Sequence, residues 1–293
     1  MKKTSTPIYI ELANGFHLHT PEFSSTSTER LLNSDNEWEV LAGIVLSCQT
    51  GHFEPLTQIS ELLQKNNSFQ FWKAAVELLG YAGTWHMIQQ FFEKHADKLN
   101  DHSMQYFLAI VLANSCGLWA VEPLLEIHAR AIEEESRYQI ERHLSYLLEP
   151  ENEVLWAGAQ EKKVMVDSGD LEIRTIVDFK GYAQEVYTVR DTVLQGIESL
   201  NTPLYEGEVL DIVLVAKKLY ERLLSKDSVT DRIYREKMLF EASTGVDCST
   251  FFGQNNNLQY LPATTIMETF LKSNDLKRFE RGQRYFFGYP IEN

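Results

Sequence analysis

The sequence predicts a mainly α-helical protein built from repeated helix pairs, and the spacing of three glycines is the first reason. Gly51, Gly83 and Gly117 follow one another at gaps of 32 and 34 residues, and each ends a stretch with the helical period. A large aromatic residue stands two positions after each glycine: Phe53, Trp85 and Trp119. Repetition at intervals of roughly 20 to 50 residues is typical of stacked helical repeats, because one unit cannot bury its apolar face alone.

The first unit begins at Asn36. Apolar residues then fall at positions i, i+3, i+6, i+7 and i+10, which share one helical face: Trp38, Leu41, Ile44, Val45 and Cys48. Gly51 suits the left-handed backbone conformation that closes a helix. Pro55 suits the first turn of the next helix, where its missing N–H group is not needed. That second helix has its own inward stripe: Leu56, Ile59, Leu62 and Leu63.

Two further units repeat this plan, and a fourth is less regular. The second unit follows the predicted N-cap Ser68 and ends its first helix at Gly83. The third unit covers residues 101–128, and the fourth covers residues 133–148. Four helix pairs predict a short stack of the HEAT-like kind over residues 36–150.

The pattern changes after Pro150. Residues 164–175, with Ser-Gly-Asp at their centre, indicate either a short hairpin or one irregular extended segment. Helices are predicted over residues 179–199 and 209–224, and a mixture of helix and loop from Thr230 onward. The sequence thus predicts three parts: an N-terminal extension, residues 1–35; a HEAT-like helical repeat array, residues 36–150; and an α-rich C-terminal domain, residues 151–293.

The first 35 residues contain a predicted strand, Pro7 to Leu12, and a Ser/Thr-rich run, Ser24 to Thr28, which is either a linker or an ordered edge segment. The chain begins with basic residues but lacks the apolar region of a secretory leader. No stretch approaches the ~20 apolar residues of a membrane span. These features predict a cytoplasmic protein with no membrane partner.

The chain carries an acid excess, with a net charge of −15. Residues 36–150 hold 7 basic and 15 acidic side chains, so the excess is densest in the predicted repeats. Nucleic-acid binding depends on clustered Lys and Arg, and the charge does not favour it. A basic protein is the more natural partner. Solubility alone is the other interpretation of this charge.

The sequence contains no recognisable catalytic or metal-binding motif. His17 and His19 have the alternation of two metal ligands on a strand, but no third ligand lies at a recognisable offset. Cys248 and Ser249 have no base nearby in the sequence. The three cysteines, Cys48, Cys116 and Cys248, lie far apart and fit buried thiols in a reducing compartment. We therefore expect no catalytic residues, no metal, no cofactor and no enzymatic activity.

Two C-terminal blocks are more distinctive than ordinary helix: FEASTGVDCSTFF, residues 240–252, and RFERGQRYFFGYP, residues 278–290. Gly245 is predicted to stop a helix, with Asp247 or Ser249 capping the next turn. The tail from Arg284 to Phe287 concentrates aromatic area. It either docks on the preceding helices and covers the end of the array, or forms a hot-spot surface for a partner. Docking is the favoured interpretation.

These two blocks resemble those of a family of predicted immunity proteins from bacterial polymorphic toxin systems, in which a HEAT-like array precedes a domain that ends in an RYFFG-type tail. The segments WKAAVELLGYAG and HLSYLLEPE are similar to the family as well. The resemblance covers residues 36–293 and is specific in the last 55 or so. It implies a bacterial, cytoplasmic protein that binds and neutralises a cognate toxin domain and catalyses no reaction.

Combined with the acid excess, the resemblance predicts a toxin domain with a basic surface. The expected contact uses the turns between helices and the faces of the second helices, at Trp85, His86, Trp119, Glu122 and Glu126. Two other classes of protein remain as alternatives. One is a general helical-repeat scaffold that binds several partners, and the other is an enzyme of the helical-repeat DNA glycosylase type. The second needs a basic concave face, which the charge count disfavours.

Overall fold

The computed structural model describes residues 15–18, 27–149, 159–165, 171–177, 179–225, 230–253 and 257–292, with backbone alone for 159–165, 171–177, 179–180 and 230–231. These residues are mainly helical, with a few short strands, so the predicted mainly α fold class is confirmed. The predicted strand at 7–12, His19 and most of the run at 24–28 lie outside the described residues.

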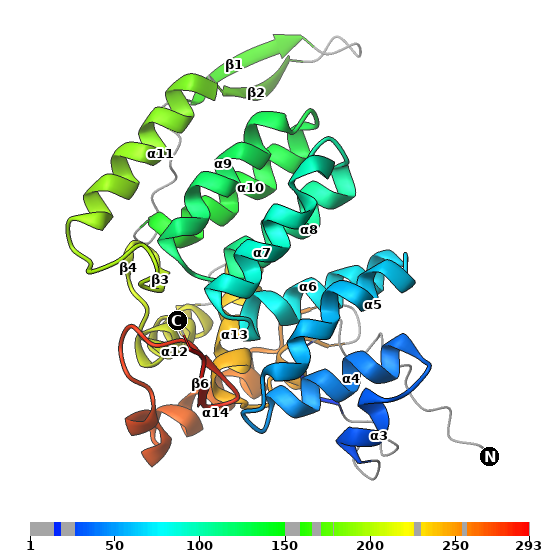
Figure 1. The fold of residues 1–293 in the computed structure, drawn as a ribbon. Coiled ribbons are helices and arrows are strands. Elements are labelled where there is room, and N and C mark those ends of the chain that lie inside the picture. Colours follow the sequence, from blue (N-terminus) through cyan, green and yellow to red (C-terminus); the bar gives the residue numbers. More distant parts are fainter. Residues whose placement is uncertain are drawn as a thin grey trace.

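The helices of the predicted array are present in the expected order (Figure 1). They are α3 (Thr28–Leu32), α4 (Glu37–Cys48), α5 (Ile59–Lys65), α6 (Phe69–Ala82), α7 (Trp85–His95), α8 (His102–Asn114), α9 (Val121–Arg130) and α10 (Glu134–Leu148). Short 3-10 turns precede α5 and α9, and α8 packs against α6, α7, α9 and α10. In Figure 1 the blue to green helices form one continuous stack.

The repeated glycines end the helices for different physical reasons. Gly51 follows α4 with φ +83°, the left-handed conformation that the sequence predicts. In the third unit Cys116 takes the positive φ of 57° instead, and Gly117 is extended with φ −83°. A β-carbon at Gly117 would lie 2.3 Å from the indole nitrogen of Trp119, so close packing requires glycine there. The predicted N-cap is confirmed, since the Ser68 hydroxyl accepts a hydrogen bond from the N–H of Phe71.

The C-terminal half begins with a hairpin of β1 (Ala159–Met165) and β2 (Leu171–Val177), antiparallel with Ala159 opposite Val177. This decides between the two interpretations of the segment in favour of the hairpin. The remaining elements are α11 (Phe179–Leu194), β3 (Leu204–Tyr205), β4 (Glu208–Val209), α12 (Ile212–Ser225), α13 (Thr230–Thr244), α14 (Tyr260–Leu271), β5 (Tyr285–Phe286) and β6 (Tyr289–Pro290). A short 3-10 turn, Ser249–Phe251, precedes α14.

Two predicted helix boundaries in this half were wrong. The helix predicted to reach Ser199 ends at Leu194. The helix predicted from Val209 begins at Ile212, because Val209 pairs in the β3–β4 hairpin and the carboxylate of Asp211 accepts hydrogen bonds from the first helical N–H groups. Gly245, with φ +71°, ends α13 as predicted, and Asp247 caps the following turn through the N–H of Ser249.

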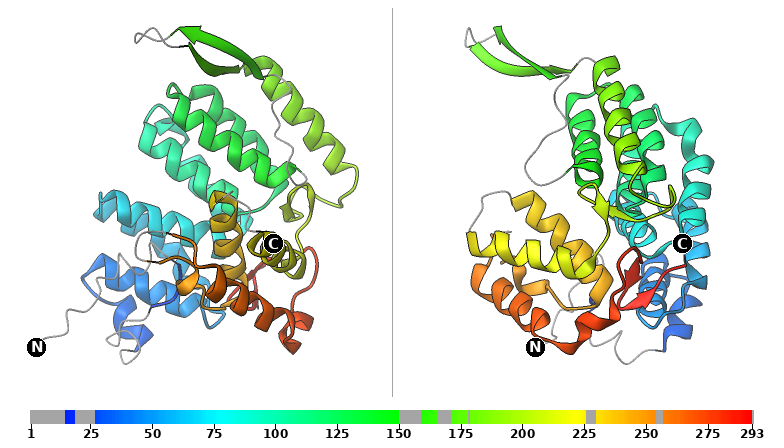
Figure 2. Two further views of the ribbon diagram at one scale, coloured as in Figure 1. Left: turned by 180° about the vertical axis from the view of Figure 1, so that it is seen from behind. Right: turned by 90° about the vertical axis from the view of Figure 1, so that its left-hand side faces the viewer.

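The main hydrophobic core is continuous across residue 150. It joins buried side chains of α4 to α10 with those of the C-terminal half, among them Tyr182, Leu204 and Phe286. It also contains Phe16, which belongs to the predicted N-terminal extension. A second cluster fills the space between α12, α13 and α14. The right-hand view of Figure 2 shows α12, α13 and α14 as a layer beside the stack, with β5 and β6 between them.

Candidate functional site

The residues predicted to bind a partner form two groups, one on α7 and one on α9 and the turn before it. Trp85 and His86 open α7, and the exposed His86 ring lies 2.9 Å from the amide nitrogen of Gln90. Trp119 lies in the turn before α9, and Glu122 and Glu126 are exposed on α9 itself. Helix α8 packs against both α7 and α9. The structure therefore places the two groups on different helices that share a neighbour.

Both predicted carboxylates already have partners within the chain. Glu122 on α9 accepts a hydrogen bond of 2.7 Å from Arg190 on α11. Glu126 accepts one of 2.7 Å from Arg130, one helical turn further on. A basic partner would have to replace these contacts or share the carboxylates, because each oxygen can accept more than one hydrogen bond. The local field on α9 is therefore weaker than the count of acidic residues suggests.

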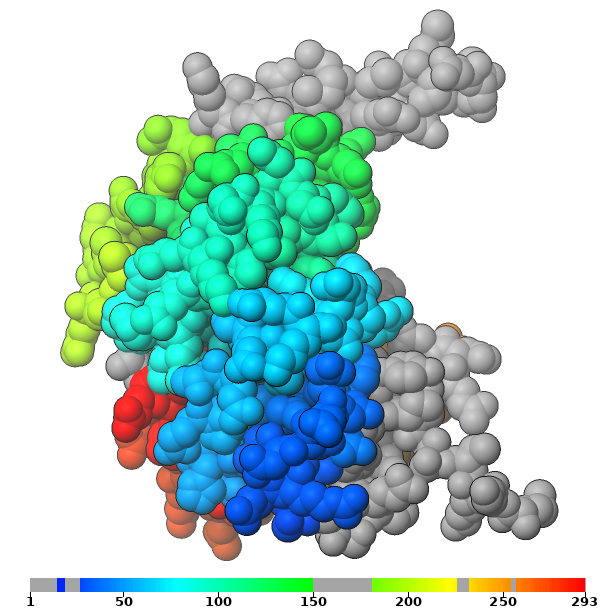
Figure 3. Space-filling model, turned by 45° about the vertical axis from the view of Figure 1, so that its right-hand side comes forward, coloured from blue at the N-terminus to red at the C-terminus, as the bar shows by residue number. Residues whose placement is uncertain are grey.

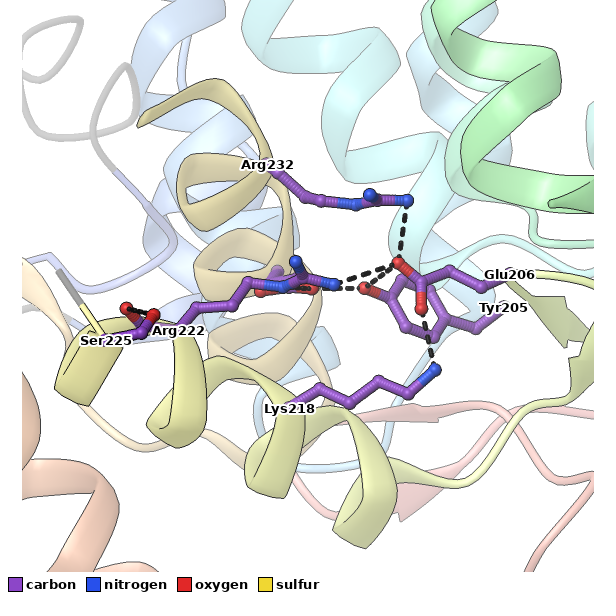
Figure 4. A network of polar contacts seen from close by, with 7 residues as sticks. Tyr205, Glu206, Lys218, Arg222, Ser225 and Arg232 are labelled. Carbon is purple, nitrogen blue, oxygen red and sulfur yellow. Dashed lines mark hydrogen bonds and ion pairs between the residues drawn. The ribbon is translucent and has the colours of Figure 1, made fainter. Parts of the chain in front are cut away.

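A cluster that sequence reasoning missed lies between β3, α12 and α13 (Figure 4). Its centre is Glu206, whose side chain is fully buried. Lys218 approaches one carboxylate oxygen at 2.7 Å, while Arg232 and Arg222 approach the other at 2.8 Å and 3.3 Å. Burying a carboxylate is costly unless cations and hydrogen bonds compensate, and three cations from two helices do so here.

Glu236 on α13 extends the cluster. Its carboxylate accepts a hydrogen bond of 2.9 Å from the Arg222 guanidinium and another from the Tyr205 hydroxyl. Burial raises the pKa of Tyr205 well above its ordinary value, and the two nearby carboxylates raise it further, so the hydroxyl keeps its proton and donates. Burial also raises the pKa of Glu236, against the opposing charge of Arg222.

The geometry of this cluster suits a structural role rather than ligand binding. A cavity beside the cluster, lined by Tyr205, Tyr146, Arg235 and neighbours, has a volume of about 10 Å³, enough for one water molecule. The contacts join a hairpin turn to the two helices that follow it in the chain. We conclude that the cluster holds α12 and α13 in place beside the stack.

A local signal for this cluster exists in the sequence. Glu206 and Gly207 have φ values of +52° and +74°, and they form the two-residue turn of the β3–β4 hairpin. Glycine at the second position of a two-residue turn is part of a hairpin signal, because both turn residues need positive φ. The signal predicts the turn. It does not predict that Glu206 points into three cations.

A second buried charge lies in the C-terminal tail. The guanidinium of Arg284 donates to three backbone carbonyls at the end of α6: Gly80 at 2.6 Å, Gly83 at 2.8 Å and Tyr81 at 3.2 Å. Arg284, Tyr285 and Phe286 are buried. The docking interpretation of this tail is thereby confirmed, but its predicted position was wrong. The tail packs against α6 and α13 at the side of the stack, because the carbonyls that need donors lie there.

The turns of the stack are in contact with the C-terminal half of the chain. The ring of Tyr289 lies against Gly51, Arg284 binds the carbonyl of Gly83, and Gly117 pairs with Pro203 in a β-bridge. The backbone N–H of Trp119 donates to the carbonyl of Leu200 at 3.1 Å. The repeated glycine turns thus form an internal docking surface for the C-terminal half.

The three cysteines are free and buried, as the sequence predicts. Burial raises the pKa of Cys48 to about 12, and the charge of Glu54 adds to the shift. Burial likewise raises the pKa of Cys116 and of Cys248. A thiol needs to be ionised and accessible to react, so these three are poor nucleophiles.

We therefore expect none of the three thiols to react with dithiobis(nitrobenzoate) in the native protein at pH 8. All three should react in denaturant. Release of the coloured thiolate, followed at both conditions, measures this directly. Rapid reaction of Cys248 in the folded protein would show that it is exposed and would reopen its role as a nucleophile.

Comparison of the chain with protein-family models, curated proteins and solved structures finds no match. Among the described residues, no helix has both the length and the apolar character that crossing a bilayer requires. In the same part of the chain, no three His, Cys, Asp or Glu side chains gather as metal ligands would.

Proposed function

We propose that this chain is a protein-binding module that recognises a basic partner through helices α7 and α9 of its stack. The supporting observation is the distribution of charge over residues 36–150. Ten of the fifteen acidic side chains in this range are exposed, against four of the seven basic ones. Exposed charge of one sign steers association with a partner of opposite sign. Helices α7 and α9 carry three of these carboxylates, Glu93, Glu122 and Glu126, and Asp97 lies just beyond α7. Three exposed cations lie among them, Lys94, Lys98 and Arg130, so the local excess on these two helices is small.

We further propose that the helix pairs α4–α5, α6–α7 and α8–α9 are HEAT-like repeats and that the partner is a toxin domain. In this proposal the chain is a bacterial immunity protein that neutralises its cognate toxin in the cytoplasm by direct binding, with no reaction of its own. The support is the resemblance of residues 240–252 and 278–290 to the C-terminal blocks of that family. The test is titration against the C-terminal domain of the large protein encoded immediately upstream of the gene. Nanomolar binding and loss of toxicity on co-expression are expected, and failure of the folded protein to bind would remove the proposal.

A second experiment tests whether the carboxylates of α9 take part in the contact. Changing Glu122 and Glu126 to Lys should slow association with this toxin domain about tenfold at low salt, because steering depends on the local field. The difference should shrink as salt screens the charges. Stopped-flow association rates at several ionic strengths measure both effects.

Glu268→Lys combined with Glu280→Lys, which also reverses two exposed carboxylates, is the matched control for this experiment. Glu268 is exposed on α14 and pairs with Lys272 four residues later, as Glu126 pairs with Arg130. The control makes the same kind of charge change away from α9, so its effect on the rate should be smaller. An association rate unaffected by the double change would exclude α9 from the contact.

A further inference from the structure

A short stretch of the predicted N-terminal extension is buried between elements that are distant from it in the sequence. We call residues 15–18 the anchor segment. Phe16 is 2% exposed, and its ring meets two other rings edge to face. The ring centroid of Tyr81 on α6 is 5.6 Å away, and that of Phe286 on β5 is 5.3 Å away. These are distances of favourable aromatic pairs. The anchor segment therefore contacts the stack and the C-terminal tail at the same time.

Side chains of the surrounding elements hold the backbone of Phe16 from both sides. Its N–H donates to the carboxylate of Glu241 on α13 at 3.0 Å. Its carbonyl accepts a hydrogen bond of 2.6 Å from the side-chain amide of Gln49, just after α4. The anchor segment itself belongs to no helix or strand. Partners for the backbone of one residue, beside a pocket for its side chain, are the means by which proteins bind peptides.

The residue before Phe16 is selected as well. A β-carbon at Gly15 would lie 2.0 Å from Oε1 of Glu241, the atom that accepts the Phe16 N–H. The carboxylate cannot easily move aside, because its other oxygen lies 2.7 Å from the Lys237 ammonium and both side chains are only 2% exposed. The contacts thus fit glycine followed by phenylalanine. This pair of residues occurs once in the chain.

The walls around the anchor segment are held by contacts that do not involve it. Arg284 fastens the tail to the end of α6, as described above. The N–H of Phe287 donates to the carbonyl of Ala242 on α13 at 2.7 Å, and the next N–H donates to the next carbonyl at 2.8 Å. Figure 3 shows the red C-terminal segment beside the blue part of the stack. Glu241 keeps its contact with Lys237 when the Phe16 N–H is withdrawn. We therefore expect these walls to stay in place when the segment leaves.

We propose that α4, α6, α13 and β5 form a peptide-binding site for a Gly-Phe segment, and that residues 15–18 are its built-in, exchangeable ligand. The same segment supplied as a separate peptide occupies the site when the chain's own segment is withdrawn. Glu241 accepts the N–H of the incoming phenylalanine, Gln49 donates to its carbonyl, and Tyr81 and Phe286 contact its ring. This inference does not rest on the proposed toxin contact, because the site shares no residue with α7 or α9.

The test uses the full-length Phe16→Ala variant, which lacks the ring that fills the site. The probe is a fluorescein-labelled peptide with the sequence of residues 12–20, LANGFHLHT. Fluorescence anisotropy should show saturable binding to this variant with a dissociation constant below about 1 mM. The wild type should bind the peptide at least about tenfold more weakly, because its tethered segment competes at a high effective concentration. Thermal unfolding checks that the variant folds.

A second measurement does not need that variant. A protease recognition sequence is inserted before Ser27, which is exposed, and the protein is cut after it has folded. The released N-terminal fragment should stay bound through its anchor segment. An excess of the unlabelled peptide should then displace it, as size-exclusion chromatography detects.

Phe69→Ala is the matched control, because it removes an exposed phenylalanine of α6 and leaves the site occupied. It should bind the labelled peptide no better than the wild type does. Adding Gln49→Ala to Phe16→Ala should weaken peptide binding about fivefold, since one hydrogen bond is lost.

A peptide with alanine in place of its phenylalanine should bind the Phe16→Ala variant at least about tenfold more weakly. Equal binding of the two peptides would overturn the proposal. So would a cut fragment that excess peptide does not displace, or the absence of binding to the folded variant. Loss of toxin binding with retained peptide binding would overturn the proposed function alone.

Discussion

Arg284→Met should lower the free energy of unfolding by about 3–5 kcal/mol, the range expected when a buried charged group that serves several hydrogen bonds is removed. Three carbonyls at the end of α6 would lose their donor, and each unsatisfied buried group costs about 1–3 kcal/mol. The side chain is only 6% exposed, so water cannot easily replace it. Urea denaturation followed by circular dichroism measures the change.

Arg281→Met is the control for this prediction, because Arg281 precedes Arg284 by three residues and is exposed. It should change stability by less than about 0.5 kcal/mol. Arg284→Lys should fall between the two, since an ammonium keeps the charge but lacks the planar fork that spans separate carbonyls. If Arg284→Met unfolds at the wild-type urea concentration, the tail does not hold the end of α6.

The helices of the array could be predicted because their signals are local. The stripe ending at Cys48, the N-cap Ser68 and the turn at Gly51 each depend on residues within one helix or one turn. The same holds for the stop at Gly245. The boundary at Val209 failed because helical periodicity alone does not reveal a short hairpin, and Val209 pairs with Leu204 instead of starting α12.

The candidate site was harder to predict, because a count of acidic and basic residues does not show which of them form ion pairs. Glu126 and Arg130 are four residues apart, so their ion pair follows from helix geometry. Glu122 and Arg190 are 68 residues apart, and only the packing of α11 against α9 brings them together. The Glu206 cluster is of the second kind, since its members come from a turn and two helices.

The blocks that carry the family resemblance build the core in this structure. Phe240, Ala242 and Phe251 of the first block are buried, as are Arg284 and Phe286 of the second. Residues under such packing constraints preserve a fold while the surface changes. In the proposed function, these blocks would therefore bear on architecture, and the choice of partner would depend on exposed residues such as those of α7 and α9.

Glu206→Gln should lower the free energy of unfolding by about 3–5 kcal/mol, because removing one member of a buried ion cluster leaves the others uncompensated. Lys218 and Arg232 would lose the carboxylate that they contact, while Arg222 would keep its contact with Glu236. Glu208→Gln, two residues later and exposed, is the matched control and should be nearly neutral. Urea denaturation of both variants gives the comparison.

A double-mutant cycle with Lys218→Met decides whether the cluster acts as a unit. Lys218 is 2.7 Å from Glu206 with a side chain 17% exposed, so removing both charges restores part of the balance that either single change disturbs. The double variant should be more stable than the sum of the single effects implies, with a coupling of about 1–3 kcal/mol. Additive losses would mean that Lys218 and Glu206 are stabilised independently. In that case the attachment of α12 beside the stack would depend on its apolar contacts with α13 and α14 and not on the buried charges.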